Sequence, residues 1–283
     1  MLKFPDGYLV KPRCRWGFGQ PVHGQIWSVL DKSRGVYDNA LKEIEGQRLI
    51  LHEIDFDRNT SDAMVPYWNN AWFSTLDAAS LVGFLLSRNP KHYVEIGSGL
   101  STLFAAYAIS RGRLRTTITS IDPTPRRDID AVCDTVVRRG LEDCPFKVFD
   151  ELEQGDVLFF DGSHRIFTNS DVSVFFLEVL PRLTAGILVH VHDIFLPSDY
   201  PSIWNARFYS EQYILAAMLC CGAPPFRIVL PNFFLCNDPA LSPRVRELFK
   251  AEVDQGRDIP FNYGHGLGFP GVSFWFETTP LMD

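Results

Sequence analysis

VEIGSGLSTLF, residues 94–104, decides the fold, because it runs from a strand through a tight turn into a helix. The turn contains Gly97 and Gly99, and the apolar residues that follow have helical spacing. Glycine allows the backbone to turn sharply and to approach a ligand that any Cβ atom would exclude. In open α/β sheets, ligands bind at the carboxyl ends of strands, beside turns of this kind. The stretch therefore predicts an α/β sheet with a ligand-binding turn after this strand.

From residue 92 onward the chain alternates short apolar runs with amphipathic segments. Nearly continuous apolar strands alternating with helices are typical of a mostly parallel sheet that is covered on both faces. We expect one α/β domain over residues 74–283, preceded by a lead-in segment, 1–73, that covers the sheet and the site. The expected strands are 92–97, 116–122, 156–162, 186–193, 226–231 and 272–277, and the expected helices are 36–47, 74–88, 101–111, 127–139, 170–182 and 207–221.

Composition favours a globular cytoplasmic protein that acts on small molecules. The 283 residues carry a net charge of −7, which gives no electrostatic reason to expect binding to nucleic acid or to an anionic membrane. The N-terminus lacks the apolar core of a signal peptide, and no run reaches the roughly 18 to 20 apolar residues of a membrane span. The six cysteines form no C-x-x-C pair and indicate reduced thiols. The composition is also compatible with a homo-oligomer.

Two further residues indicate which class of ligand the glycine turn binds. A dinucleotide-binding turn would have a third glycine where this chain has Thr102, and this weighs against NAD. Asp122 closes the next predicted strand, where an acid can accept both hydroxyls of a ribose. The alternative is a turn aspartate before Pro123. Together with the glycine turn, Asp122 favours a nucleoside.

The pattern E-x-G-x-G-x-S that ends at Ser101, followed by SID at 120–122, resembles class I S-adenosylmethionine-dependent methyltransferases. The resemblance covers residues 74–277 and implies a Rossmann-like fold with a mostly parallel, seven-stranded sheet. It also implies an antiparallel last strand, here VSFWFE at 272–277. By position, the resemblance implies S-adenosylmethionine contacts from Glu95, Gly97, Ser98, Gly99, Ser101 and Asp122, and from Asp150 in the segment that usually forms the adenine pocket.

Polar side chains also follow two later strands, in LFFDGSH (158–164) and VHVHD (189–193). In metal-dependent O-methyltransferases of the catechol type, an aspartate ends strand four and two oxygen ligands end strand five. The resemblance implies a metal bound by Asp161, His192 and Asp193, with His164 at the offset of the family's basic catalytic residue. Because His192 stands where oxygen ligands prevail, the metal preference moves from magnesium towards manganese, iron, cobalt or zinc.

Each of these assignments has a simpler alternative. Asp161 could bond only the backbone amides of its own turn, and His192 could be a neutral core histidine. His190 lies two residues inside the strand, so we expect it to pack and hydrogen-bond internally. At the level of function, the main prediction is O-methylation of a small molecule assisted by a divalent metal. A metal-dependent hydroxylase on the same fold and a non-catalytic nucleoside-binding protein are the alternatives.

A long segment after Asp193 separates the last polar strand end from the next helical pattern. Loops of this length in a compact domain are usually functional. We expect its aromatic and basic side chains to cover the acceptor, or else to pack as a compact surface loop. These side chains are Tyr200, Trp204, Arg207 and Tyr209.

Overall fold

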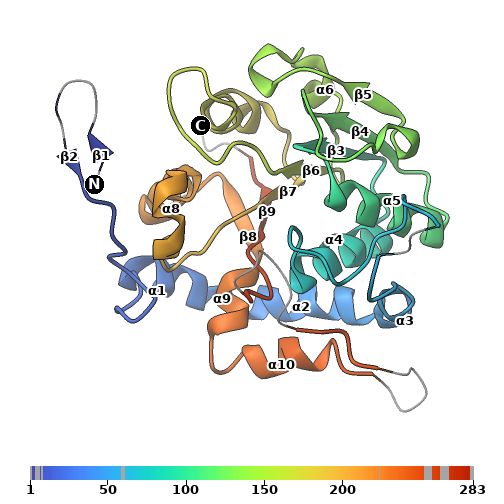
Figure 1. Ribbon diagram of the computed structural model, residues 1–283, viewed down its shortest axis with the longest axis horizontal. Helices are drawn as coiled ribbons and strands as arrows, with labels where there is room; N and C mark the ends of the chain where they lie inside the picture. Colours follow the sequence, from blue (N-terminus) through green and yellow to red (C-terminus); the bar gives the residue numbers. More distant parts are fainter. Residues whose placement is uncertain are drawn as a thin grey trace.

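A seven-stranded sheet forms the centre of the computed structural model, which describes residues 2–3, 7, 9–58, 61–222, 224–251, 257–261 and 268–280 (Figure 1). The strand order is β5-β4-β3-β6-β7-β9-β8. The strands are β3 (His92–Ile96), β4 (Thr117–Ile121), β5 (Thr135–Val137), β6 (Val157–Phe160), β7 (Leu188–Val191), β8 (Phe226–Pro231) and β9 (Phe274–Thr278).

The strand directions confirm the predicted Rossmann-like methyltransferase fold. Each pair of neighbours from β5 to β7 is parallel, and only β9, the last strand, runs antiparallel to both of its neighbours. The chain begins the sheet at β3 and adds β4 and β5 on one side before it crosses to β6 on the other. Ligands bind at such a switch in strand order. The glycine turn after β3 and the acidic turn after β6 therefore lie on either side of the switch.

One predicted element is wrong. Residues 127–139 do not form a helix but a 3₁₀ turn, η1 (Asp130–Val132), followed by strand β5. Thr135, Val136 and Val137 pair in parallel with Thr119–Ile121 of β4. Two of these three residues are valines and the third is threonine, and β-branched side chains are stiff at χ1 and favour strands over helices. The strand is at the sheet edge and half exposed, so it lacks the continuous apolar run by which the other strands were recognised.

Helices cover both faces of the sheet, as expected (Figure 1). On one face α4 (Thr75–Arg88) packs against α5 (Leu100–Gly112) and α2 (Arg34–Glu45). On the other, α7 (Asp171–Val174) continues through a π-helical turn, Phe175–Val179. The described part of the chain contains no helix that is long and apolar enough to cross a membrane.

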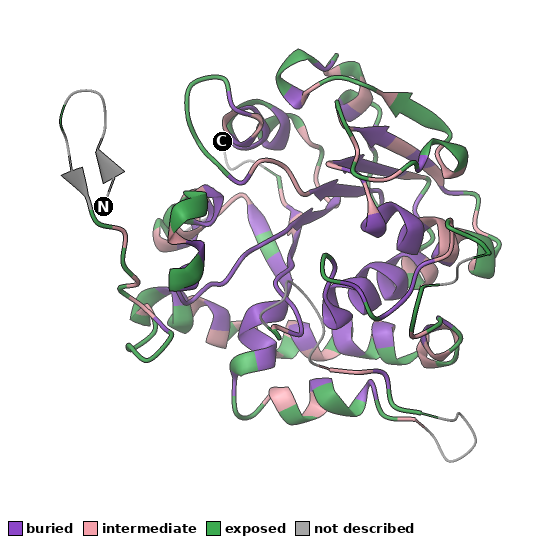
Figure 2. Cartoon of the chain, viewed as in Figure 1, coloured by how far each residue is buried: buried purple, intermediate pink, exposed green. Residues whose placement is uncertain are grey.

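The remaining helices flank this core, and Figure 2 shows the buried residues concentrated on the strands and on α4 and α5. Ile26, Tyr37 and Leu41 from the N-terminal segment are buried in the same cluster as the sheet residues. That segment therefore packs on the domain as well as preceding it. The flanking elements are α1 (Gly24–Lys32), α3 (Arg48–His52), η2 (Leu141–Asp143), α6 (Lys147–Asp150), the 3₁₀ turn Leu180–Arg182, η5 (Ser202–Arg207), α8 (Glu211–Cys220), α9 (Asn232–Asn237), α10 (Ser242–Glu247) and the short hairpin β1 (Leu2–Lys3) and β2 (Leu9–Val10).

Candidate active site

Two adjoining cavities open at the carboxyl ends of the central strands. The first has a volume of about 550 Å³ and is lined by residues of the glycine turn, the N-terminal segment and the β7 end. The second has a volume of about 450 Å³ and lies along the ends of β3, β4 and β6. Four residues line both cavities and so form the wall between them: Ser98, Arg126, Asp161 and His164.

The glycine turn lies directly against the end of β6. Gly97 has φ +80°, and a Cβ atom there would come within 1.8 Å of the carbonyl oxygen of Asp161. At Gly99, the residue before α5, an added Cβ would meet no atom within 4 Å, so the backbone there faces open space. The turn therefore needs glycine at 97 for close contact with the neighbouring strand end, and it presents Gly99 to the first cavity.

Thr102, at the position where a dinucleotide-binding turn would have glycine, braces this turn. Its hydroxyl accepts a hydrogen bond from the Gly99 amide (2.9 Å) and donates one to Glu95. The hydroxyl of Tyr93 also donates to Glu95 (3.1 Å). Burial raises the pKa of Glu95 to about 7, although hydrogen bonds from Ser101, Thr102 and Tyr93 partly oppose this effect. Glu95 lines neither cavity, so it supports the turn from below.

Asp122 lies directly after β4 and lines the second cavity. Its carboxylate accepts hydrogen bonds from the amides of Ser98 and Thr124, both at 2.8 Å. The turn role, the alternative that the sequence left open, is thus real. Each carboxylate oxygen has a second lone pair, so Asp122 can still accept a ligand hydroxyl. Ser98 reaches both cavities, and Ser101 lines the first.

Asp150 is exposed at the end of α6 and lines neither cavity. The second cavity is instead lined by Gly140, Leu141 and Glu142, at the start of η2. Analysis of the sequence missed these residues because they belong to an irregular connection without a motif.

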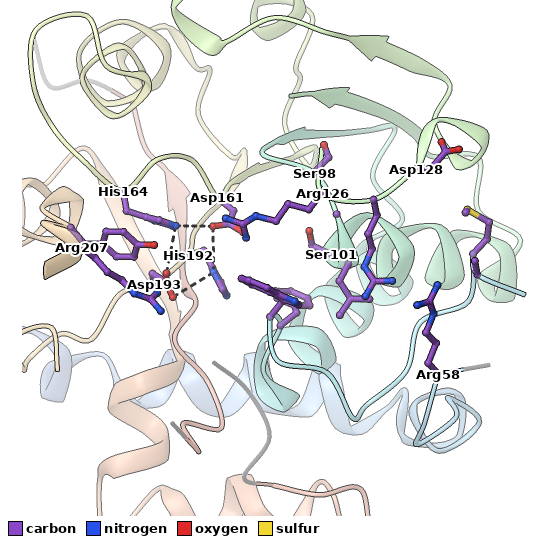
Figure 3. A pocket seen from close by; sticks show the side chains of 18 residues that line it. Arg58, Ser98, Ser101, Arg126, Asp128, Asp161, His164, His192, Asp193 and Arg207 are labelled. Atoms are coloured by element: carbon purple, nitrogen blue, oxygen red, sulfur yellow. Dashed lines mark ion pairs between the residues drawn. The ribbon is translucent and has the colours of Figure 1, made fainter. Parts of the chain in front are cut away.

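The predicted strand-end residues converge. Because Phe160 pairs with Val191 in the parallel β6–β7 register, the residues that follow each strand are neighbours. Asp161 Oδ1 lies 3.5 Å from His192 Nδ1, and Asp193 Oδ1 lies 3.7 Å from the same nitrogen. His164 Nε2 faces the same space, at 3.2 Å from Asp161 Oδ1 and 3.5 Å from Asp193 Oδ2 (Figure 3). We call these four side chains the strand-end cluster.

A buried carboxylate lies behind each of the two histidines. Asp77 Oδ2, from α4, is 3.5 Å from Nε2 of His192, and Glu211, from α8, hydrogen-bonds Nδ1 of His164. Both acids have no exposed surface. Asp77 is itself fixed by the amides of Val272 and Ser273 and by the side-chain amide of Asn232. Sequence analysis predicted neither acid, because an acidic residue in the first turn of a helix is common at exposed positions.

The charges of the cluster compensate one another. Burial alone would lower the pKa of His164, but the carboxylates of Glu211 and Asp193 raise it well above 6.5. The pKa of His192 responds in the same way: burial lowers it, but Asp161, Asp77 and Asp193 together raise it well above 6.5. Burial would raise the pKa of Asp161, but the two histidines hold it well below its usual range. Each histidine of the cluster thus faces carboxylates that favour its protonated form.

His190 has a structural role, which confirms the prediction. Its ring is fully buried, stacks on Phe159 at 3.7 Å and shares a 2.7 Å hydrogen bond with Ser273. Burial keeps its pKa well below 6.5. The two histidines of the VHVHD stretch thus differ: His190 belongs to the core, and His192 to the cavity floor.

The loop after β7 contributes two of its four predicted side chains to the first cavity. Arg207 and Tyr209 line the first cavity. Tyr200 and Trp204 pack instead in a separate buried cluster with Phe195, beneath the loop.

No three or more histidine, cysteine, aspartate or glutamate side chains in the described ranges are placed so that they could hold a metal ion as they stand. The four members of the strand-end cluster contact one another instead.

The family comparison matches this region. Residues 94–194 fit the model of a family described as a methyltransferase domain, and the match runs from the glycine turn to both strand ends. This stretch of the chain is similar to a methyltransferase domain. The braced glycine turn and the strand-end cluster both lie inside the matched residues. No curated protein matches the chain at a significant level.

Three solved structures are distantly similar to this chain. The SAH-bound methyltransferase PaMTH1 of Podospora anserina is 16% identical, with a TM-score of 0.40, over 76% of this chain and 94% of that one. An O-methyltransferase from Bacillus cereus in complex with SAH is 14% identical, with a TM-score of 0.36, over 88% and 97%. A putative methyltransferase from Thermobifida fusca is 12% identical, with a TM-score of 0.37, over 93% and 97%.

Proposed function

We propose that this methyltransferase transfers a methyl group from S-adenosylmethionine to a hydroxyl of a small molecule, with the help of a divalent metal. The observation that carries the proposal is the wall of Ser98, Arg126, Asp161 and His164 shared by two cavities. A methyl donor in one cavity and an acceptor in the other would meet at this wall.

The second cavity suits the nucleoside part of the donor. Asp122 would accept the ribose hydroxyls, and the backbone of the glycine turn allows close approach at Gly97. Leu141 and Glu142 are in place to line an adenine pocket. The sulfonium end would then reach the shared wall.

The first cavity suits the acceptor on the side of His192 and Asp193, and its glycine-turn side, lined by Gly99 and Ser101, suits the methionine end of the donor. Its volume of about 550 Å³ falls within the usual range of roughly 300 to 1,000 Å³ for small-molecule sites. Methyl transfer from a sulfonium is an in-line displacement, so the protein must align the two reactants, exclude water and provide an activated oxygen nucleophile. Phe73 and Tyr209 supply apolar walls, and the strand-end cluster supplies the polar floor.

The donor chemistry of the floor fits a divalent metal. Histidines that bind metals almost always donate their second ring N–H to a carboxylate or carbonyl, which fixes the ring. Asp77 lies in that position, next to Nε2 of His192. Its carboxylate also accepts hydrogen bonds from the amides of Val272 and Ser273 and from the side-chain amide of Asn232. Asp161, His192 and Asp193 would hold the ion, which would replace the present ion pairs between them. When bound, the metal would lower the pKa of the acceptor hydroxyl and orient it.

His164 and Glu211 would together accept the proton that the acceptor hydroxyl loses. His164 Nε2 points to the floor between Asp161 and Asp193, and its other nitrogen is bonded to Glu211. Such a pair shares its protons, so we assign the general base to the pair and not to His164 alone. The family match favours this chemistry over the hydroxylase and non-catalytic alternatives. The cytoplasmic location predicted from the cysteines, all six of which are free, is part of the proposal.

Direct analysis of the purified protein tests the proposal. Calorimetry should show binding of S-adenosylmethionine and not of NAD, and elemental analysis after loading should find one divalent ion per chain. Turnover of a panel of hydroxylated acceptors should stop on chelation and return with manganese or magnesium. Full turnover by metal-free protein would refute the metal, and failure to bind S-adenosylmethionine would refute the cofactor assignment.

A further inference from the structure

The first cavity is rich in arginine, although the chain as a whole carries a net charge of −7. Its lining includes Arg58, Arg126, Arg127 and Arg207. Arg207 lies on the side of Asp193 and His164, and Arg58 lies at the far side of the cavity (Figure 3). Basic side chains thus lie around a cavity whose floor is the strand-end cluster.

Two of these arginines are held by aromatic rings and not by acids. The guanidinium of Arg126 lies 4.7 Å from the ring centroid of Trp72, and that of Arg207 lies 4.1 Å from the ring of Trp204. Arg207 also lies 5.5 Å from the ring of Tyr209. No carboxylate of a described residue is within ion-pair distance of either guanidinium. Arg127 lies 5.7 Å from the ring of Tyr67 and also donates a hydrogen bond to its hydroxyl at 2.8 Å.

A guanidinium stacked on a ring has a defined position and keeps its N–H groups available at its edge. This planar fork matches the two oxygens of a carboxylate or phosphate, and aromatic stacking holds the side chain in place before the ligand arrives. Arg126 and Arg207 differ from most other ring-stacked arginines in that they also line the first cavity, as does Arg127. An anion that enters this cavity can therefore be bound by them.

The positions of Arg126 and Arg207 indicate which of the two reactants could carry an anion that each would bind. Arg126 lines both cavities, so it lies where the donor's own carboxylate could also reach it. Arg207 lines only the first cavity and lies on the side of Asp193 and His164, away from Ser101 of the glycine turn (Figure 3). We therefore assign an anion bound by Arg207 to the acceptor.

We propose that the acceptor is a hydroxylated small molecule that carries an oxyanion, a carboxylate or a phosphate, and that Arg207 binds this group. The inference rests on the proposed function, because it assigns the first cavity to the acceptor. The arrangement also orients the molecule: Arg207 binds the oxyanion at the wall, while the hydroxyl faces the cluster. Arg207 is then a specificity-determining residue for the methyl transfer.

The test measures by calorimetry how tightly matched probes bind to the protein saturated with S-adenosylhomocysteine. The probes are 3,4-dihydroxybenzoate, its neutral methyl ester and inorganic phosphate. The free acid should bind at least about tenfold more tightly than the ester, on the scale of one charge-assisted hydrogen bond. Arg207→Gln should abolish this preference and leave the ester unaffected, whereas Arg207→Lys should retain part of it. Arg115→Gln, at an exposed position remote from both linings, is the matched control and should bind like the wild type.

The outcomes separate this inference from the proposed function. Binding of the acid alone would identify a carboxylate acceptor, and Arg207-dependent binding of phosphate would identify a phosphorylated one. If S-adenosylhomocysteine binds but neither oxyanion binds in an Arg207-dependent way, the acceptor inference is wrong and the methyl-donor site stands. If S-adenosylhomocysteine itself fails to bind, the proposed function is wrong.

Discussion

Glu95 allows a quantitative test of how the glycine turn is held. The side chain has no exposed surface and accepts hydrogen bonds from Tyr93 and Thr102. Burial raises its pKa from 4.5 to about 7, so the folded chain binds this proton more tightly than the unfolded chain does. The contribution of Glu95 to stability is therefore complete below about pH 4.5 and is lost as the pH rises through about 7. With 1.36 kcal/mol per pKa unit, the full span is on the order of 3 kcal/mol.

The Glu95→Gln variant keeps the shape of the side chain and removes its titration. At pH 5 we expect its free energy of unfolding to lie within about 1 kcal/mol of the wild type, since the protonated acid and the amide are both neutral. At pH 8 the variant should have gained about 1 to 3 kcal/mol relative to the wild type. Urea denaturation followed by tryptophan fluorescence at pH 5, 6, 7 and 8 measures this difference.

The difference between the two proteins is the informative quantity, because all other titrating groups contribute equally to both curves. Glu178→Gln, at an exposed position on the π-helical turn, serves as the control and should give a difference that does not change with pH. A pH-independent difference for Glu95→Gln as well would mean that Glu95 is ionised in the folded chain. The hydrogen bond that Thr102 donates to Glu95 would then be one to an ionised carboxylate.

The other predictions concern the ligands. Asp122→Ala should weaken S-adenosylmethionine binding by about 1 to 3 kcal/mol in calorimetry, and equal affinity would remove the ribose assignment. His192→Ala should lose the bound metal in elemental analysis, whereas His190→Ala should lower the melting temperature and keep the metal; equal metal content in both would argue against the strand-end site. His164→Ala should lower turnover by roughly 10²- to 10⁴-fold with little change in cofactor affinity, and a loss of only a few-fold would leave it a packing role.

The features that could be predicted from the sequence are those with a local cause. The apolar runs of the buried strands, the glycine turn and the polar residues at the strand ends all follow from neighbouring residues, and the structure has each of them. The parallel order of β6 and β7 then brings Asp161 and His192 together without further information. His190 was assigned to the core for a similar reason, since it lies inside its strand.

The features that were missed depend on distant parts of the chain. Asp77 reaches His192 across 115 positions of sequence, and Glu211 reaches His164 across 47. Each acid lies in a helix whose sequence allows an exposed acidic residue equally well, so only the packing of that helix on the sheet reveals the contact. The helix predicted at 127–139 failed because an edge strand is half exposed, and its sequence lacks the apolar run of a buried strand.

The contact between Gly97 and Asp161 explains why the two cavities belong to one site. The glycine turn can lie against the end of β6 only because no Cβ separates it from the Asp161 carbonyl. The same residue directs its side chain to His164 and His192. A change in the position of the turn would therefore move one end of the strand-end cluster, and a change in the cluster would act on the turn. The switch in strand order places the two strands side by side, and the glycine brings their ends into contact. For a group transfer between two bound substrates, this contact would fix the distance between the proposed donor site at the turn and the proposed acceptor site at the cluster.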